Sequence, residues 1–305
     1  MRTVLAILSV AVSIGFAPDA PTPPATSRTR VVMLGTGVPF PDPDRFGSAT
    51  VVIVDSTPYL VDCGVGVVRR WAAAIRADSL PLRVYDLRRV FITHLHSDHT
   101  LGYPELILTS WTVEKPPRRP LLAYGPAGLV AMTEHILAAY AADIHIRTDS
   151  GGELAGVSPP AVVTHEIEPG VVYHDSLVTV TAFPVHHGTW PQAFGYRFQT
   201  PDKVIVISGD AGPPSTVSEQ CQRCDILIHE GGYVTPPGTQ PPGYQESFHT
   251  SAVDLAAIAN ISRPRLLVLY HQGPLTPEQQ AERLHAIRSR YNGEVVMARD
   301  LDIFQ

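Results

Sequence analysis

The stretch THLHSDHTLG, residues 93–102, places three imidazoles and a carboxylate within six positions: His94, His96, Asp98 and His99. It overlaps the end of RRVFITH (88–94), whose apolar run predicts a buried strand. Imidazole and carboxylate are the usual protein ligands of zinc and similar divalent ions. Histidines two positions apart in an extended turn can face one ion, while Asp98 and His99, where a helix would begin, can aim at a second point nearby. The stretch therefore predicts a metal site at a strand end.

Three other segments offer further ligands at strand ends. FPVHHG offers His186 or His187, VISGDAG offers Asp210 and LVLYHQG offers His271. Adjacent side chains on an extended chain point to opposite faces, so only one of the two neighbouring histidines is expected to serve the site. Strands mixed with helices and ending in His or Asp predict a layered α/β protein with one site along a sheet edge.

Together these segments resemble the metallo-β-lactamase-fold hydrolase superfamily: HxHxDH at 94–99, a later His, the Asp of SGD and a final strand-end His. The opening MLGTGVPFPDPDRFGSATVVIVDSTPYLVDCGVG is similar to the branch that contains ribonuclease Z and related arylsulfatase- and phosphodiesterase-type enzymes. The resemblance covers nearly all of residues 30–305. It implies an αββα four-layer sandwich with a two-metal site on one edge.

The resemblance also implies a ligand set for two divalent ions. Zinc (Zn2+) is expected, with Mn2+ or Fe2+ as alternatives, because His and Asp ligands accept several metals. His94, His96 and His187 would hold the first ion, Asp98, His99 and His271 the second, and Asp210 would bridge them. In this branch the third histidine is followed by Gly and shortly afterwards by a GYR strand, which selects His187 over His186 in HGTWPQAFGYRF.

Two segments, LIHEGGY and FHTSA, resemble those that supply a Glu and a His near the leaving group, here Glu230 and His249. The implied mechanism uses a hydroxide that bridges the two metals as nucleophile, with Asp98 both a ligand and a hydrogen-bond partner of it. His249 would protonate the leaving group and Glu230 would orient His249. The residues alone also allow His249 to lie near the start of the helix TSAVDLAAIANI, and Glu230 to be a structural carboxylate.

The predicted function is an exported dinuclear metal-dependent hydrolase of small-molecule phosphodiesters or related sulfate and phosphate esters. A thioester or lactone hydrolase of the glyoxalase II or lactonase type is the alternative, and a ribonuclease Z-like endonuclease is a further one. The formal net charge of −6 and the lack of a long basic run weigh against nucleic acid as the partner. A homodimer fits the resemblance, because dimers are common in the family.

The N-terminus, MRTVLAILSVAVSIGFA, has one Arg and then an apolar run over residues 4–17. This run is shorter than the roughly 20 residues of a transmembrane helix. We therefore expect a signal peptide over residues 1–20 with an open cleavage site, a disordered linker over 21–29 and one hydrolase domain over 30–305. The protein would be periplasmic or secreted, without stable membrane association after cleavage; an N-terminal membrane anchor is the alternative.

Three cysteines and one irregular segment complete the sequence-based expectations. Cys221 and Cys224 would form a small disulfide in an exported protein or remain free thiols, and a metal role for the pair is weakly supported. Cys63 is expected to be a small buried residue. The Pro- and Gly-rich segment 231–248 predicts either a surface loop or a lid over the site.

Overall fold

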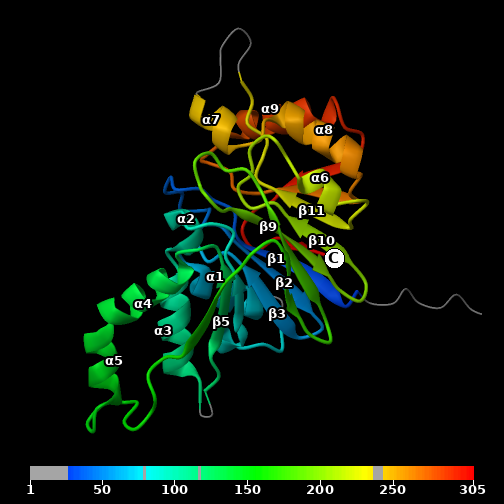
Figure 1. Cartoon of the computed structure of the whole chain (residues 1–305). Helices are drawn as coiled ribbons and strands as arrows, with labels where there is room; N and C mark the ends of the chain where they lie inside the picture. The colour runs from blue at the N-terminus through cyan, green and yellow to red at the C-terminus, as the bar shows by residue number, and fades with distance from the viewer. Residues whose placement is uncertain (1–26, 78–79, 116–117, 236–242) are drawn as a thin grey trace, which may run out of the picture.

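The computed structural model describes residues 27–77, 80–115, 118–235 and 243–305. Within these residues the strands form two seven-stranded sheets that lie face to face, with helices on both outer sides (Figure 1). The strand order is β14-β1-β2-β3-β4-β5-β6 in the first sheet and β13-β12-β11-β10-β9-β8-β7 in the second. The predicted αββα four-layer sandwich is therefore confirmed.

Each sheet combines antiparallel and parallel strands. The first contains β1 (Thr29–Gly35), β2 (Ala49–Val54), β3 (Thr57–Val61), β4 (Arg89–Phe91), β5 (Leu121–Gly125), β6 (Val162–Glu166) and β14 (Ile303–Phe304). The second contains β7 (Gly170–His174), β8 (Thr179–Pro184), β9 (Phe194–Gln199), β10 (Val204–Ile207), β11 (Ile226–His229), β12 (Leu266–Leu269) and β13 (Glu294–Met297). Strands β10 to β13 run parallel, so their carboxyl ends meet at one edge of the sheet.

Helices cover the outer face of each sheet. Along the first sheet the chain forms α1 (Val67–Ala77), η1 (Val84–Asp86), α2 (Ser97–Thr100), α3 (Tyr103–Val113), α4 (Leu129–Ala139) and α5 (Ala141–Thr148). Along the second it forms α6 (Val217–Gln220), α7 (Gly243–Phe248), α8 (Ala252–Ser262) and α9 (Pro277–Arg288). Thr276 and Gln279 form a capping box at the start of α9. Helices α4 and α5 follow each other directly but are separate, because the chain leaves helical geometry at Tyr140.

The largest apolar core lies between the two sheets. Val31 and Val52 of the first sheet pack in it with Ile205, Ile226 and Val268 of the second. The short strands β10, β11 and β12 consist almost wholly of apolar residues, as expected for parallel strands covered on both faces. Buried strands of this kind hold the residues at their ends firmly, and these ends carry the candidate site.

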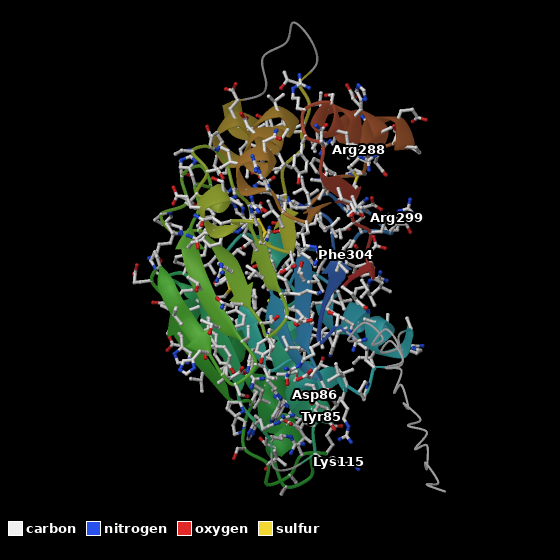
Figure 2. The ribbon with its side chains drawn as sticks, turned by 90° about the vertical axis from the view of Figure 1, so that its right-hand side faces the viewer. Tyr85, Asp86, Lys115, Arg288, Arg299 and Phe304 are labelled. Atoms are coloured by element: carbon white, nitrogen blue, oxygen red, sulfur yellow. A yellow bond between two sulfur atoms is a disulfide. The ribbon has the colours of Figure 1, made fainter. Side chains whose placement is uncertain are left out.

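The two ends of the described chain meet at the edge of the first sheet. Phe304 of β14, labelled in Figure 2, pairs with Val31 of β1. Thr29, the last residue of the predicted linker, already belongs to β1, and its hydroxyl donates a hydrogen bond to Asp202. Residues 1–26, which hold the predicted signal peptide and most of the linker, lie outside the described residues. Among the described helices, none has the length and apolarity needed to cross a membrane.

The cysteines adopt one of the arrangements allowed by the sequence. Cys221 and Cys224 form a disulfide beside α6, and both are buried in the core under the second helical layer. Cys63 is a buried free cysteine just after β3, as predicted.

Candidate metal centre

The seven predicted ligands come together at the edge where the two sheets meet. Each follows a strand or begins a short helix: His94 after β4, His96, Asp98 and His99 around α2, His187 between β8 and β9, Asp210 after β10, and His271 after β12. They form two groups, His94–His96–His187–Asp210 and Asp98–His99–His271, and within each group the donor atoms lie within 4.8 Å of one another. Most of these side chains are buried, and His96 is half-buried.

In the first group, ring nitrogens converge on a common point. His96 Nδ1 lies 2.9 Å from His94 Nε2 and 3.2 Å from His187 Nε2. The predicted register at the two neighbouring histidines agrees with this geometry, since His187 is buried in the group and His186 is exposed. Gly188 follows with a φ of 56°, a left-handed conformation that favours glycine.

In the second group, His271 Nε2 lies 3.0 Å from Asp98 Oδ2, and His99 Nε2 lies 3.5 Å from the same oxygen. Asp210 stands between the two groups. Its Oδ1 is 3.4 Å from His99 Nε2, and its Oδ2 is 3.8 Å from His187 Nε2. A carboxylate placed in this way can offer one oxygen to each of two ions.

The donor set fits divalent metal ions. His99 Nε2 and Asp210 Oδ1 are buried, and neither has a hydrogen-bond partner among the described residues. Buried polar atoms without a partner cost free energy, so their presence at the centre of the cluster points to a ligand that they would bind. Imidazole nitrogens and carboxylate oxygens in this number suit zinc, manganese or iron.

Other residues fix the orientation of the ligand rings. Asp62 accepts hydrogen bonds from His99 Nδ1 (2.7 Å) and from the backbone N–H of Thr93 (2.8 Å). The Phe248 carbonyl accepts from His187 Nδ1 at 2.8 Å. Each contact leaves the Nε2 atom facing the cluster, as is usual for metal-binding histidines. Trp190 adds its indole N–H, 2.8 Å from His96 Nε2.

The sequence patterns predict no role for these supporting residues. Asp62 lies directly after β3 in the quoted segment PYLVDCG, and an Asp in that position is ordinarily a turn residue. Its place after a buried strand that neighbours β4 was the one available signal.

Burial and charge set the protonation of the cluster. Burial lowers the pKa of His187 to about 4 and that of His94 well below its usual value, which keeps both imidazoles neutral and able to ligate. Burial also opposes protonation of His99, but the charges of Asp210 and Asp62 raise its pKa well above the usual value. Asp210 is desolvated as well, yet the surrounding imidazoles, His271 foremost, hold its pKa well below the usual range.

Glu230 and His249, predicted to act on the leaving group, form a pair beside the cluster. His249 Nδ1 lies 3.1 Å from Glu230 Oε2, and Glu230 Oε1 accepts from the backbone N–H of Thr250 at 3.0 Å. His249 also lies within 4.8 Å of Asp210 and His271, measured between donor atoms. Burial works against protonation of His249, but the hydrogen bond to Glu230 raises its pKa. The N-cap of α8 is Ser251, so His249 does not cap that helix.

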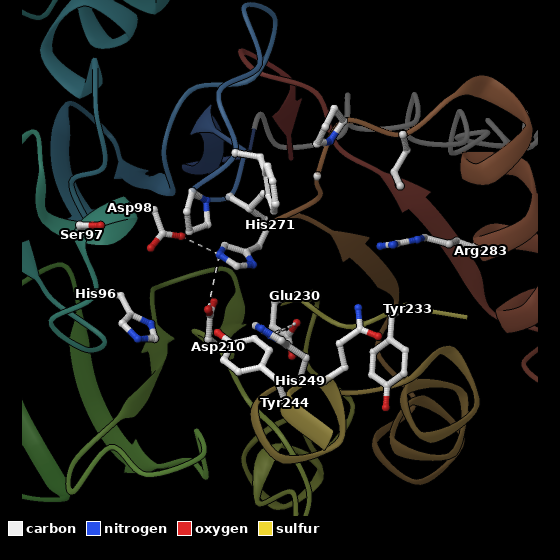
Figure 3. Close-up of a pocket in the computed structure, with 17 residues that line it drawn as sticks. His96, Ser97, Asp98, Asp210, Glu230, Tyr233, Tyr244, His249, His271 and Arg283 are labelled. Atoms are coloured by element: carbon white, nitrogen blue, oxygen red, sulfur yellow. Dashed lines mark hydrogen bonds and ion pairs between the residues drawn. The ribbon is translucent and has the colours of Figure 1, made fainter. Parts of the chain in front are cut away.

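The two groups open into a cavity of about 640 Å³ (Figure 3). Its walls include His96, Asp98 and Asp210 on one side, and Tyr233 and Tyr244 from the segment 231–248 on another. The described parts of this segment therefore form part of the cavity wall, whereas residues 236–242 lie outside the described residues.

Comparisons with known proteins agree with this fold. The protein family described as "Beta-lactamase superfamily domain" matches this chain over residues 57–272. The chain is 31% identical over 276 residues to a ribonuclease Z of Mycobacterium bovis, with 89% of this chain and 96% of the relative covered. The metallo-β-lactamase fold protein YhfI of Bacillus subtilis superposes with a TM-score of 0.70 at 16% identity, over 90% of this chain and 98% of that one. The short form of human tRNase Z gives a TM-score of 0.67 at 24% identity, over the same shares of the two chains.

The fold and the donor set define a metal-dependent hydrolase that acts on ester bonds. The chain belongs to the metallo-β-lactamase superfamily, in the branch that includes ribonuclease Z.

Proposed function

We propose that this hydrolase cleaves phosphodiesters or related phosphate and sulfate esters of small molecules, with His249 as the proton donor to the leaving group. The observation that carries the proposal is the Glu230–His249 pair on the wall of the cavity, beside Asp210 and His271. An ester bound against the cluster would have its leaving oxygen within reach of this imidazole.

The residues divide the work as follows. His94, His96 and His187 would hold one ion, Asp98, His99 and His271 a second, and Asp210 would touch both; zinc is the ion we propose. Bound metal ions supply Lewis acidity and lower the pKa of coordinated water.

The protein groups then position and protonate the reactants. Asp98 would accept a hydrogen bond from the water that attacks the ester and would orient that water. Glu230 holds the His249 ring through Nδ1, which leaves Nε2 as the nitrogen that would donate a proton to the leaving oxygen.

A leaving-group series tests the role of His249. His249→Ala should slow the release of an alkoxide from a dialkyl phosphodiester by about 100-fold or more, because an alkoxide needs a proton. It should slow the release of 4-nitrophenoxide far less, because this group leaves as a stable anion. Glu230→Gln should show the same pattern more weakly. An equal loss for both leaving groups would contradict the proposal, and faster turnover of a thioester, lactone or β-lactam than of any diester would overturn the substrate class.

A ribonuclease Z-like endonuclease is the second candidate, favoured by 31% identity over 96% of the length of a ribonuclease Z. The acidic net charge of −6 favours small esters instead. Incubating the purified protein with a tRNA precursor carrying a 3′ extension decides between them. Endonucleolytic cleavage at a rate above that of the best small diester would replace our first proposal by the second.

We further propose that the protein is exported. The apolar run over residues 4–17 and the Cys221–Cys224 disulfide support this, since disulfides persist mainly in oxidising compartments. Expression of the full chain in a Gram-negative host, followed by N-terminal sequencing of the periplasmic protein, provides the test. Export predicts a new N-terminus within about the first 30 residues, whereas an intact N-terminus in the cytoplasmic fraction would contradict it.

A further inference from the structure

The wall of the cavity opposite His96 and Asp98 carries a guanidinium that the mechanism does not use. Arg283 projects from α9 into the cavity, and Figure 3 shows its side chain pointing toward the side where His271 lies. It is half-buried, and its Nη1 donates a hydrogen bond of 2.7 Å to Gln272 Oε1. Gln272 in turn donates to the Glu230 carbonyl, so one nitrogen of the guanidinium is held in place.

Arg283 has no carboxylate partner within 4.0 Å among the described residues. The charges of Glu230 and Glu282 act on Arg283, but neither carboxylate pairs with it, and the Glu230 oxygens already accept from His249 and from the backbone N–H of Thr250. The sequence of 236–242, PPGTQPP, contains no acidic residue that could serve instead. A guanidinium stays charged in proteins, so Arg283 brings to the cavity a positive charge with spare N–H donors and, in the described part of the chain, without an ion-pair partner within 4.0 Å, although the charges of Glu230 and Glu282 act on it from farther away.

The space between Arg283 and the ligand cluster has largely apolar and aromatic walls. Phe40, Tyr233, Tyr244 and Leu275 contribute to them. Phe40 is also strongly exposed for a phenylalanine, at 71% of its surface. Walls of this kind fit a flat or apolar segment of a bound molecule, with a charged group at each end of the cavity.

We propose that Arg283 is a specificity-determining residue that binds a second anionic group, a carboxylate or phosphate, at the non-reacting end of the ester substrate. This inference rests on the proposed ester hydrolase function. The substrate class is then an ester in which the group that does not leave contains an aromatic ring or a short alkyl chain. This group would cross the space between the ligand cluster and Arg283 and would end in an anion. The planar guanidinium fork suits such an oxyanion because it can donate two parallel hydrogen bonds.

A matched series of diesters tests the proposal on the metal-loaded enzyme. One substrate is 4-nitrophenyl phenyl phosphate, and the others carry a carboxyl group on the phenyl ring, attached directly or through one or two methylenes. All release 4-nitrophenol. In the wild-type enzyme at least one acidic arm should raise kcat/KM about tenfold, mainly through a lower KM, since one charge-assisted hydrogen bond is of that order. The methyl ester of the same acidic arm should show no gain in kcat/KM.

Variants then assign the gain to Arg283. Arg283→Gln should remove the preference for the acidic arm and leave turnover of the neutral diester within about twofold, and Arg283→Lys should restore part of the preference. The matched control is Arg290→Gln, which removes the same charge from an exposed residue just beyond α9.

The outcomes separate this inference from the proposed function. If no acidic arm improves kcat/KM in the wild-type enzyme, or if Arg283→Gln lowers all diesters equally, Arg283 only supports Gln272 and the inference is wrong. If the metal-loaded enzyme turns over no diester at all, the proposed function fails instead. Should Arg283→Gln not fold, the wild-type series decides alone, together with inhibition by 4-carboxyphenyl phosphate, which should bind about tenfold more tightly than phenyl phosphate.

Discussion

Replacing Asp62 by Asn exchanges a hydrogen-bond acceptor for a donor opposite His99 Nδ1. In the wild-type protein the Asp62 carboxylate lies 2.7 Å from this nitrogen, which must therefore carry a proton, and Nε2, which faces Asp98 and Asp210, is the nitrogen left to bind a metal ion. An amide NH₂ at the same place would favour the proton on Nε2. That tautomer cannot ligate through Nε2, so the second group of ligands loses one member.

The magnitude follows from the contact that is lost. A charge-assisted hydrogen bond contributes about 1.5–3 kcal/mol, and supporting contacts to metal-binding histidines typically change metal affinity by about 10- to 100-fold. The fold should tolerate the change. Asn can still accept from the Thr93 backbone N–H, and it adopts readily the left-handed φ of 57° found at Asp62.

The assay is a zinc titration of metal-depleted protein in competition with a chromophoric chelator. Asp62→Asn should bind its first ion as the wild type does and its second about 10- to 100-fold more weakly, with an unchanged circular dichroism spectrum. Two ions bound with wild-type affinity would refute the reasoning about the tautomer of His99. Loss of both ions in a folded protein would show that the two groups are not separable.

Three further changes test the described geometry. His187→Ala should lower zinc content measured by mass spectrometry, whereas His186→Ala should leave it unchanged; the reverse would mean that the register of this loop is wrong. Despite partial desolvation, hydrogen bonds led by that from Thr29 lower the pKa of Asp202 to about 2. Because this folded-state pKa lies below the model-compound value of 3.8, the carboxylate stabilises the fold above about pH 4 and this contribution disappears as the pH falls toward 2. Urea denaturation should therefore show Asp202→Asn less stable by about 1 kcal/mol at pH 7, allowing for solvent screening, and equal to wild type near pH 2. Gly188→Ala would place a Cβ 2.0 Å from a ring carbon of Phe248 in α7, on a backbone with a φ of 56°. The free energy of unfolding in the same assay should fall by about 2 kcal/mol or more. Unchanged stability would show that α7 moves away freely.

The sequence was sufficient to predict the fold and which side chains meet at the candidate site, because the signals for both are local. An apolar run such as that of β10 followed by Asp210, or of β12 followed by His271, predicts a buried strand that delivers a polar side chain to a shared edge. The exposed His186 and the buried His187 could also be told apart, through the glycine that follows them.

The supporting residues could not be predicted in this way, because their roles depend on contacts between distant segments. Asp62 acts through His99, 37 positions later, and nothing in its own neighbourhood distinguishes it from a turn residue. Arg283 lies on a helix that is polar overall, so its position in the cavity depends on how α9 packs against β13. The break at Tyr140 likewise lies within a continuous helix-forming sequence.

The order of the ligands along the chain has a consequence for biosynthesis. His94, His96 and His99 leave the ribosome early, whereas His271 is added only after β11 and α8, and β14 closes the first sheet last of all. A nascent chain therefore carries an incomplete donor set that can bind an ion only weakly. The complete donor set therefore exists only after the last strands have joined their sheets, so the proposed two-ion site would be filled by a finished chain.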